Sequence, residues 1–122
     1  MHFLHYTLYS NKGFNNYRGS MDNSNKKKSD IIITTKNINQ IRKKIDSIDR
    51  KIIMLLSKRF KLVKKIGHFK NLADLPLDNE QRENEILETI GNIIDNPNVE
   101  DKIKTIYKII FKLSKEIEKE VK

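Results

Sequence analysis

Apolar side chains recur every three or four residues along the middle of this chain. Between Ile38 and Lys70, apolar residues recur at positions 38, 41, 45, 48, 52, 55, 62 and 66. This spacing places one apolar side chain per turn on a single helical face and therefore predicts a long helix. Asn37, with Gln40 following three residues later, resembles the capping box that opens a helix. At 1.5 Å per residue, a helix over these residues is roughly 50 Å long.

Two cations lie on the same face as this apolar stripe. Arg59 stands where the spacing predicts an apolar residue, and Lys70, about three helical turns later, falls on the same face. A charge inside a buried seam needs an anionic partner, because an unpaired buried charge is very costly. We expect that partner to be a ligand or a carboxylate from another helix. Gly67 costs about 1 kcal/mol relative to alanine inside a helix, which indicates close approach of another backbone or of a ligand.

A shorter second helix is predicted after a loop over residues 71–79. The helix covers about residues 80–94 and is capped by Asn79 or Asp78. Pro97 lies in the turn that follows, where it prevents the helix from continuing.

A long third helix is predicted over about residues 99–121. Its apolar positions are again spaced by three and four residues: 103, 106, 110, 113, 117 and 121. Ser114 and Glu118 lie four residues apart beside this stripe, so their side chains project to one spot. The predicted fold class is therefore all-α, with a long, a short and a long helix. Because the first helix is too long for the other two to cover, a second copy of the chain is its natural cover.

Residues 1–36 differ from the domain predicted over residues 37–122. The first twenty residues have scattered aromatics and two glycines, and a polar, lysine-rich segment typical of disorder follows them. We expect a disordered extension, or an upstream start with Met21 as the true initiator. The segment IIITT at residues 31–35 is β-prone but too short to form a sheet. The cytoplasm is the default compartment, with organelle import as the alternative, since the first twenty residues lack Asp and Glu.

The net charge of +9 favours an anionic partner, such as nucleic acid, acidic lipid or a small carboxylated metabolite. The absence of cysteine excludes disulfides and thiolate metal sites, and the three scattered histidines argue against a histidine-rich metal site. No apolar run approaches the roughly 20 residues that a membrane-spanning helix needs, so no membrane partner is expected. Aromatic residues do not alternate with the basic ones and no recognition motif is present, which argues against nucleic acid.

Three segments of the chain carry a family pattern. They read IRKKIDSIDRKIIMLLSKRFKLVKKIGHFK, LPLDNEQRENEIL and IYKIIFKLSKEIEKE. Each is weakly specific alone, but together and in this order they are specific, and from Asn37 to its end the chain resembles the all-α class of chorismate mutase. The resemblance implies an intertwined homodimer whose active sites use residues of both subunits. It also implies the Claisen rearrangement of chorismate to prephenate, with no metal or organic cofactor.

The resemblance implies that several residues bind the two carboxylates of chorismate. Arg42 matches the arginine that reaches the side-chain carboxylate from the partner subunit. Arg59 matches the arginine that binds the ring carboxylate, and Ser114 matches a serine near the carboxylate end. Arginine suits this role because its planar guanidinium binds a carboxylate through two hydrogen bonds. Arg82 matches the arginine of an Arg-Glu pair that opens the second helix.

The resemblance also implies which residues contact the substrate's hydroxyl and ether oxygen. Glu83, the glutamate of that pair, accepts a hydrogen bond from the substrate hydroxyl, while Lys70 and Glu118 face the ether oxygen. Many relatives have glutamine at the position of Glu118, and a glutamate donates a hydrogen bond only when it is protonated. We therefore expect activity to rise toward acidic pH. Asn79 replaces an aspartate of many relatives, a change we expect to be tolerated because this position also caps the helix.

Other interpretations remain open from the sequence. An isochorismate-pyruvate lyase uses a similar site on the same fold, although the match in the first helix favours the mutase. A function of another class is a basic helical module that binds nucleic acid or a partner helix, with an affinity that falls steeply with salt. Arg59 could form a structural ion pair with Glu83 or Glu118, and Ser114 could bond back to the carbonyl four residues earlier.

Overall fold

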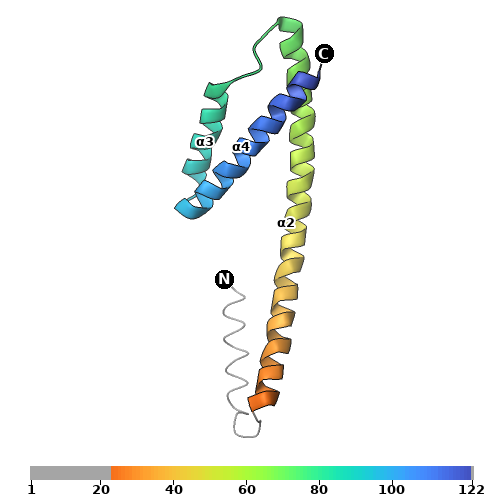
Figure 1. Ribbon diagram of the computed structural model, residues 1–122, viewed down its shortest axis with the longest axis vertical. Coiled ribbons are helices and arrows are strands. Elements are labelled where there is room, and N and C mark those ends of the chain that lie inside the picture. The colour runs from red at the N-terminus through yellow and green to blue at the C-terminus, as the bar shows by residue number, and fades with distance from the viewer. Residues whose placement is uncertain (1–22, 122) are drawn as a thin grey trace. The chain divides into compact units, whose positions relative to one another are not determined.

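The computed structural model describes residues 23–121, and within this range the chain is all-α. Its helices are α2 (Asn23–Ala73), α3 (Glu80–Ile93) and α4 (Pro97–Glu120), labelled as in Figure 1. The order of a long, a short and a long helix confirms the predicted fold class. No helix among the described residues is both long and apolar enough to cross a membrane. The chain divides into two compact units, the first of which ends at Ile52.

The first unit contains the beginning of α2, which starts at Asn23. The predicted start at Asn37 is wrong, because Asn37 lies inside the helix. The segment 23–36, which we expected to be disordered, is helical, whereas residues 1–22 of the predicted extension lie outside the described residues. The β-branched residues of this segment each cost at most about 0.7 kcal/mol in a helix, and an established helix propagates easily. The Thr35 hydroxyl donates a hydrogen bond to the carbonyl of Ile31 at 2.8 Å, so this polar group has a partner within the helix.

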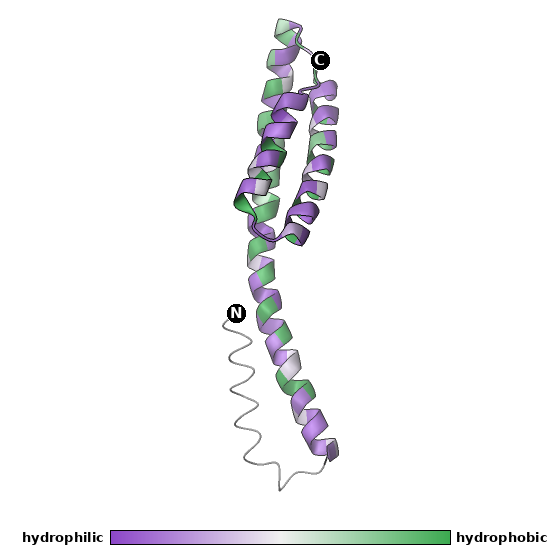
Figure 2. Ribbon diagram, turned by 90° about the vertical axis from the view of Figure 1, so that its left-hand side faces the viewer, coloured by the Kyte–Doolittle hydropathy of each residue, from purple (hydrophilic) through white to green (hydrophobic). Residues whose placement is uncertain are grey.

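An apolar stripe in the first unit is exposed to solvent. The isoleucines that predicted the helix have exposed fractions between 40% and 54%: Ile38, Ile41, Ile45, Ile48 and Ile52. Figure 2 shows hydrophobic residues recurring between hydrophilic ones along α2. This part of α2 is thus amphipathic, with an apolar face that the described chain leaves uncovered.

The second unit combines the end of α2 with α3 and α4 around a small core. The buried apolar side chains are Val63 of α2, Ile90 of α3, Ile110 and Phe111 of α4, and Val121 at the end of α4. A Cβ added to Gly67 would lie 3.0 Å from the Cα of Glu118, so the α2 backbone closely approaches α4 at this point. The prediction that Gly67 marks close approach of another backbone is confirmed.

Local signals in the sequence explain how α3 and α4 begin. The Asn79 side chain accepts a hydrogen bond from the backbone N–H of Arg82 at 3.1 Å, so Asn79 caps α3. Asn96 caps α4 in the same way, and Pro97 occupies the first turn. Pro97 therefore opens α4, two residues before the predicted start, because a first-turn residue needs no backbone N–H donor.

The segment that connects α2 to α3 is shorter than predicted. Helix α2 continues to Ala73, and the backbone N–H of Leu75 donates to the Lys70 carbonyl at 2.8 Å just beyond its end. Asp74 adopts a left-handed conformation with φ of 53°, which turns the chain away from the helix axis. The connecting loop therefore runs from Asp74 to Asn79 and carries Leu77 and Asp78 toward the candidate site.

Candidate active site

A pocket of about 350 Å³ lies in the second unit and is lined by α2, α3, α4 and the loop before α3. Its volume falls in the range of small-molecule sites. Charged and polar residues from all these elements line it: Arg59, Lys70, Asn79, Arg82, Glu83, Ser114, Lys115 and Glu118. The structure therefore brings together every site residue predicted from the sequence except Arg42.

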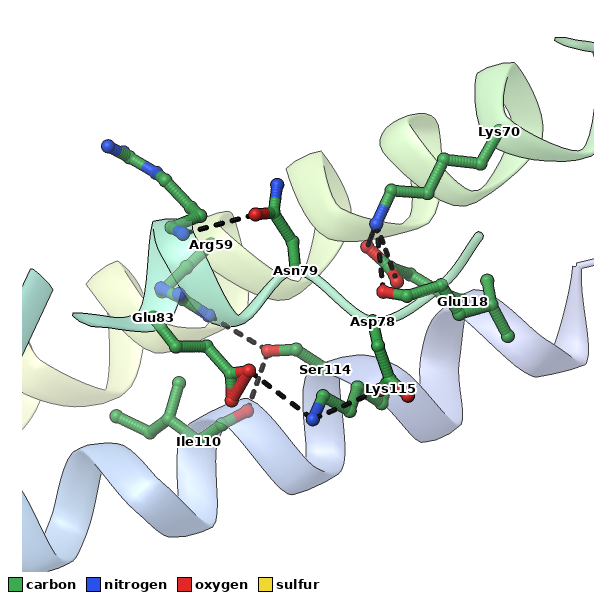
Figure 3. A network of polar contacts seen from close by, with 11 residues as sticks. Arg59, Lys70, Asp78, Asn79, Glu83, Ile110, Ser114, Lys115 and Glu118 are labelled. Carbon is green, nitrogen blue, oxygen red and sulfur yellow. Dashed lines mark hydrogen bonds and ion pairs between the residues drawn. The ribbon is translucent and has the colours of Figure 1, made fainter. Parts of the chain in front are cut away.

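Lys70 of α2 and Glu118 of α4 form an ion pair at one end of the pocket (Figure 3). The Lys70 ammonium donates to both carboxylate oxygens of Glu118 at 3.2 Å, and also to the carbonyl of Leu77 at 3.0 Å. The two charged side chains are 16% and 9% exposed. Gly67, one turn before Lys70, permits this pairing because it allows the backbone of Glu118 to approach α2. The sequence predicts a ligand or a carboxylate from another helix as the partner of the two cations. For Lys70, that partner is the carboxylate of Glu118.

Arg59 contacts a hydroxyl at another point of the same pocket. Its Nη1 donates to the Ser114 Oγ at 2.8 Å, and this hydroxyl donates to the Ile110 carbonyl at 2.6 Å. The predicted back-bonding of Ser114 is therefore present together with the contact to Arg59. Among residues 23–121, Arg59 forms no ion pair, so the structural alternative of pairing with Glu83 or Glu118 is not realised. The guanidinium keeps donors for an anion in the pocket.

The first turn of α3 supplies the remaining predicted residues. Arg82 lines the pocket but is mostly exposed, and its guanidinium pairs with Glu85 at 3.3 Å along the helix. Glu83 is less exposed, and its carboxylate pairs with Lys115 of α4 at 3.3 Å. Asn79 caps the helix, as the sequence predicts, and also lines the pocket.

Lys115 is a pocket residue that the sequence did not single out. Its Nζ lies 3.2 Å from the Oδ1 of Asp78 and 3.3 Å from the Oε2 of Glu83. The hydrogen bond to Asp78 and then the one to Glu83 raise the pKa of Lys115 above its ordinary value. A weak signal was available, since Lys115 follows Ser114 directly and lies four residues after Phe111, which also lines the pocket.

Arg42 belongs to the first unit, where its side chain is exposed. It is not among the residues that line the pocket. Its implied role at the site of a partner subunit therefore stays a prediction.

The charges of the pocket suit a ligand with more than one carboxylate. Four cations, Arg59, Lys70, Arg82 and Lys115, face two carboxylates, those of Glu83 and Glu118. The apolar remainder of the lining lowers the local dielectric constant, which strengthens charge interactions with a bound anion; it consists of Leu62, Val63, Ile66, Leu77, Ile86 and Phe111. The site can therefore bind and orient a small dianion.

Comparisons with known proteins identify similar chains. The family model of chorismate mutase type II matches residues 41–119. The chorismate mutase of Methanocaldococcus jannaschii is 34% identical over 82 residues, which cover 66% of this chain and 83% of that protein. The bifunctional chorismate mutase/prephenate dehydratase of Aquifex aeolicus is 47% identical over 53 residues, 43% of this chain and 15% of that protein. The structure of the form II chorismate mutase of Thermus thermophilus matches with a TM-score of 0.63 and 34% identity, over 67% of this chain and 93% of that chain.

Proposed function

The chain belongs to the type II chorismate mutase family, and we propose that it catalyses the rearrangement of chorismate to prephenate in phenylalanine and tyrosine biosynthesis. The observation that carries this proposal is the position of Arg59, Lys70 and Glu118, which line one pocket in a chain matched by the family model over residues 41–119.

Chorismate is a dianion, and binding it in a reactive conformation is a large part of the catalytic task. Arg59 offers its guanidinium to one carboxylate beside the Ser114 hydroxyl. Holding the substrate at both ends selects the compact conformer in which the two reacting carbons approach, so positioning lowers much of the barrier. Glu83, at the start of α3, accepts a hydrogen bond from the substrate hydroxyl. Arg82 and Asn79 line the same pocket.

The chemical step breaks a C–O bond and forms a C–C bond in one rearrangement, with no covalent intermediate. Negative charge grows on the ether oxygen as the C–O bond breaks. Donors aimed at that oxygen stabilise the transition state more than the ground state. Lys70 is one such donor, and Glu118 is a second once it carries a proton. Because these side chains supply the electrostatic stabilisation, we expect no metal or organic cofactor.

The proposal includes a homodimer with shared active sites. The exposed isoleucine stripe in the first unit is accompanied by exposed apolar residues in the second, among them Leu55 at 64% and Leu62 at 51%. Uncovered apolar surface of this extent marks an interaction face, and a second copy of the same amphipathic helix is a matching cover. In such a dimer, Arg42 of one subunit serves the pocket of the other.

The direct test is incubation of the purified protein with chorismate while the loss of its diene absorbance is followed. The product should convert to phenylpyruvate in acid, as prephenate does, and a chelator should leave turnover unchanged. No turnover between about pH 4 and 8, a range that brackets carboxyl and imidazole titration, would contradict the proposal. Release of pyruvate from isochorismate, without turnover of chorismate, would instead assign the lyase reaction.

A further inference from the structure

A single lysine of α4 connects two carboxylates from neighbouring segments. The Lys115 ammonium lies 3.2 Å from Asp78 in the loop and 3.3 Å from Glu83 in the first turn of α3 (Figure 3). The Lys115 side chain is 35% exposed and that of Glu83 is 23% exposed, whereas Asp78 is 77% exposed. The half-buried contact is therefore the one with Glu83, on the side of the pocket.

Lys115 and Glu83 separate the pocket from a second, outer groove. Both residues line the pocket, and both also line a neighbouring groove of about 310 Å³ together with Lys108, Lys112 and Lys119. The Glu83 carboxylate thus has cations available on two sides. Lys115 bonds its Oε2, which fixes the carboxylate at the wall of the pocket and leaves Oε1 as an acceptor. Without Lys115, this carboxylate would lose the ion pair that holds it, in a groove that three other lysines and Glu116 also line.

The loop before α3 is fastened by lysines from two helices. Lys70 of α2 donates to the Leu77 carbonyl at 3.0 Å, and Lys115 of α4 pairs with the next residue, Asp78. Asn79 follows directly, and its carbonyl accepts the backbone N–H of Glu83 at 3.1 Å. The position of this loop therefore sets the position of the first turn of α3. Lys115 acts on Glu83 twice, through the carboxylate itself and through the loop that holds its backbone.

We propose that Lys115 is a positioning residue of the active site, which orients the Glu83 carboxylate to accept the hydroxyl of the substrate. The inference rests on the proposed function and adds to it a residue that acts through Glu83. Because the hydroxyl does not take part in bond breaking, its contact contributes nearly equally in the ground state and in the transition state. Loss of Lys115 should therefore appear mainly in KM and little in kcat.

The test compares three variants with the wild type in the chorismate assay. Lys115→Met is expected to raise KM about three- to tenfold with kcat within about twofold. Lys115→Arg, which can pair with both carboxylates, should have a KM close to that of the wild type. Lys112→Met is the matched control: the same change of charge on the same helix, at an exposed lysine that lines the outer groove and not the pocket. It should leave KM unchanged.

Several outcomes would overturn the inference. A KM unchanged in Lys115→Met contradicts it, and so does an equal rise in Lys112→Met, which would assign the effect to overall charge. A parallel loss of kcat and of thermal stability that Lys115→Arg does not reverse would assign Lys115 a structural role only. A wild-type protein that does not convert chorismate contradicts the proposed function itself. An active wild type whose KM is unchanged by Lys115→Met contradicts this inference alone.

Discussion

Lys70 and Glu118 neutralise each other in this structure. The ammonium lies 3.2 Å from each carboxylate oxygen of Glu118, in a contact where both side chains are largely buried. An ionised Glu118 accepts hydrogen bonds and repels the negative charge that grows on the ether oxygen. In the proposed mechanism, Glu118 donates to the ether oxygen only in its protonated form, beside Lys70.

The first prediction concerns this proton. The kcat/KM of the wild type should rise toward acidic pH, because only the protonated carboxyl group of Glu118 donates to the ether oxygen. In Glu118→Gln an amide donates at every pH, so the profile should flatten and kcat/KM at about pH 8 should exceed that of the wild type. Steady-state kinetics from about pH 4 to 8 provide the measurement. An identical pH profile in both proteins would exclude the proposed role of Glu118.

The second prediction separates the charge of Arg59 from its geometry. Arg59→Lys keeps the charge but loses the planar pair of donors that binds a carboxylate, so kcat/KM should fall about 10²-fold or more. Ser114→Ala removes the hydroxyl that accepts from Arg59 at 2.8 Å while the guanidinium stays. A smaller loss, about three- to tenfold, is expected for this variant. Equal activity of Arg59→Lys and the wild type would show that Arg59 acts as a point charge.

The fold was largely predictable because its signals are local. The three-four spacing of apolar residues marks the first and third helices, and the Asn79 cap of the second is visible in the sequence itself. The start of α2 was not predictable, because Asn37 and Gln40 have the residue types of a capping box and yet lie inside the helix. Helix propensities differ by tenths of a kcal/mol between most residues, which is too little to place a helix end when the helix can propagate in either direction.

Residue spacing alone singled out candidate site residues only where one helix contains the pattern, and the family resemblance supplied the others. Arg59 and Lys70 interrupt a single apolar face, and Ser114 and Glu118 lie one turn apart, so periodicity identifies them. The role of Lys115 depends on how far its side chain reaches toward a carboxylate on another helix and toward the loop before it. That distance is a property of tertiary packing, which no local pattern contains, and the neighbouring lysines of α4 have the same sequence appearance.

The third prediction concerns the helix contact beneath the ion pair. A Cβ in Gly67→Ala would lie 3.0 Å from the Cα of Glu118, and backbone must shift to admit it. Overpacking of this kind costs about 1–3 kcal/mol, against a gain of about 1 kcal/mol in helix propensity. We therefore expect a lower or unchanged free energy of unfolding, and a loss of kcat because the shift displaces Glu118 from its position in the pocket. Urea unfolding and steady-state kinetics provide the measurements.

Gly91→Ala is the matched control for this substitution. Its Cβ would meet the Oε1 of Glu100 at 3.1 Å, the end of a flexible side chain that can move away. The helix propensity gain of up to about 1 kcal/mol should then remain, without an effect on kcat. A Gly67→Ala protein that is stabilised as much as Gly91→Ala and keeps full kcat would exclude a tight contact between α2 and α4.

The fourth prediction follows from the raised pKa of Lys115. A lysine whose pKa is higher in the folded state stabilises that state below its unfolded pKa of about 10.4, and the contribution disappears as the pH rises through the folded value. The wild type should therefore unfold at a higher urea concentration than Lys115→Met at about pH 7 to 9, a range chosen to lie below about 10.4. The difference should shrink as the pH is raised further, through the folded-state pKa of Lys115. A difference that does not change over this range would exclude the ion pairs with Asp78 and Glu83 as its cause.

The last prediction tests whether two chains share each active site. Arg42→Ala and Arg59→Ala should each lose most activity, because each removes one carboxylate-binding arginine from every site. In the proposed dimer the two arginines of one site come from different subunits. When the two inactive proteins are unfolded, mixed in equal amounts and refolded, about half of the dimers contain one subunit of each kind. Each such dimer has one site with both substitutions and one site with neither, so about a quarter of the wild-type activity should return. Refolding each variant alone is the control, and if the mixture gains no activity over these controls, Arg42 does not serve the site of a partner subunit.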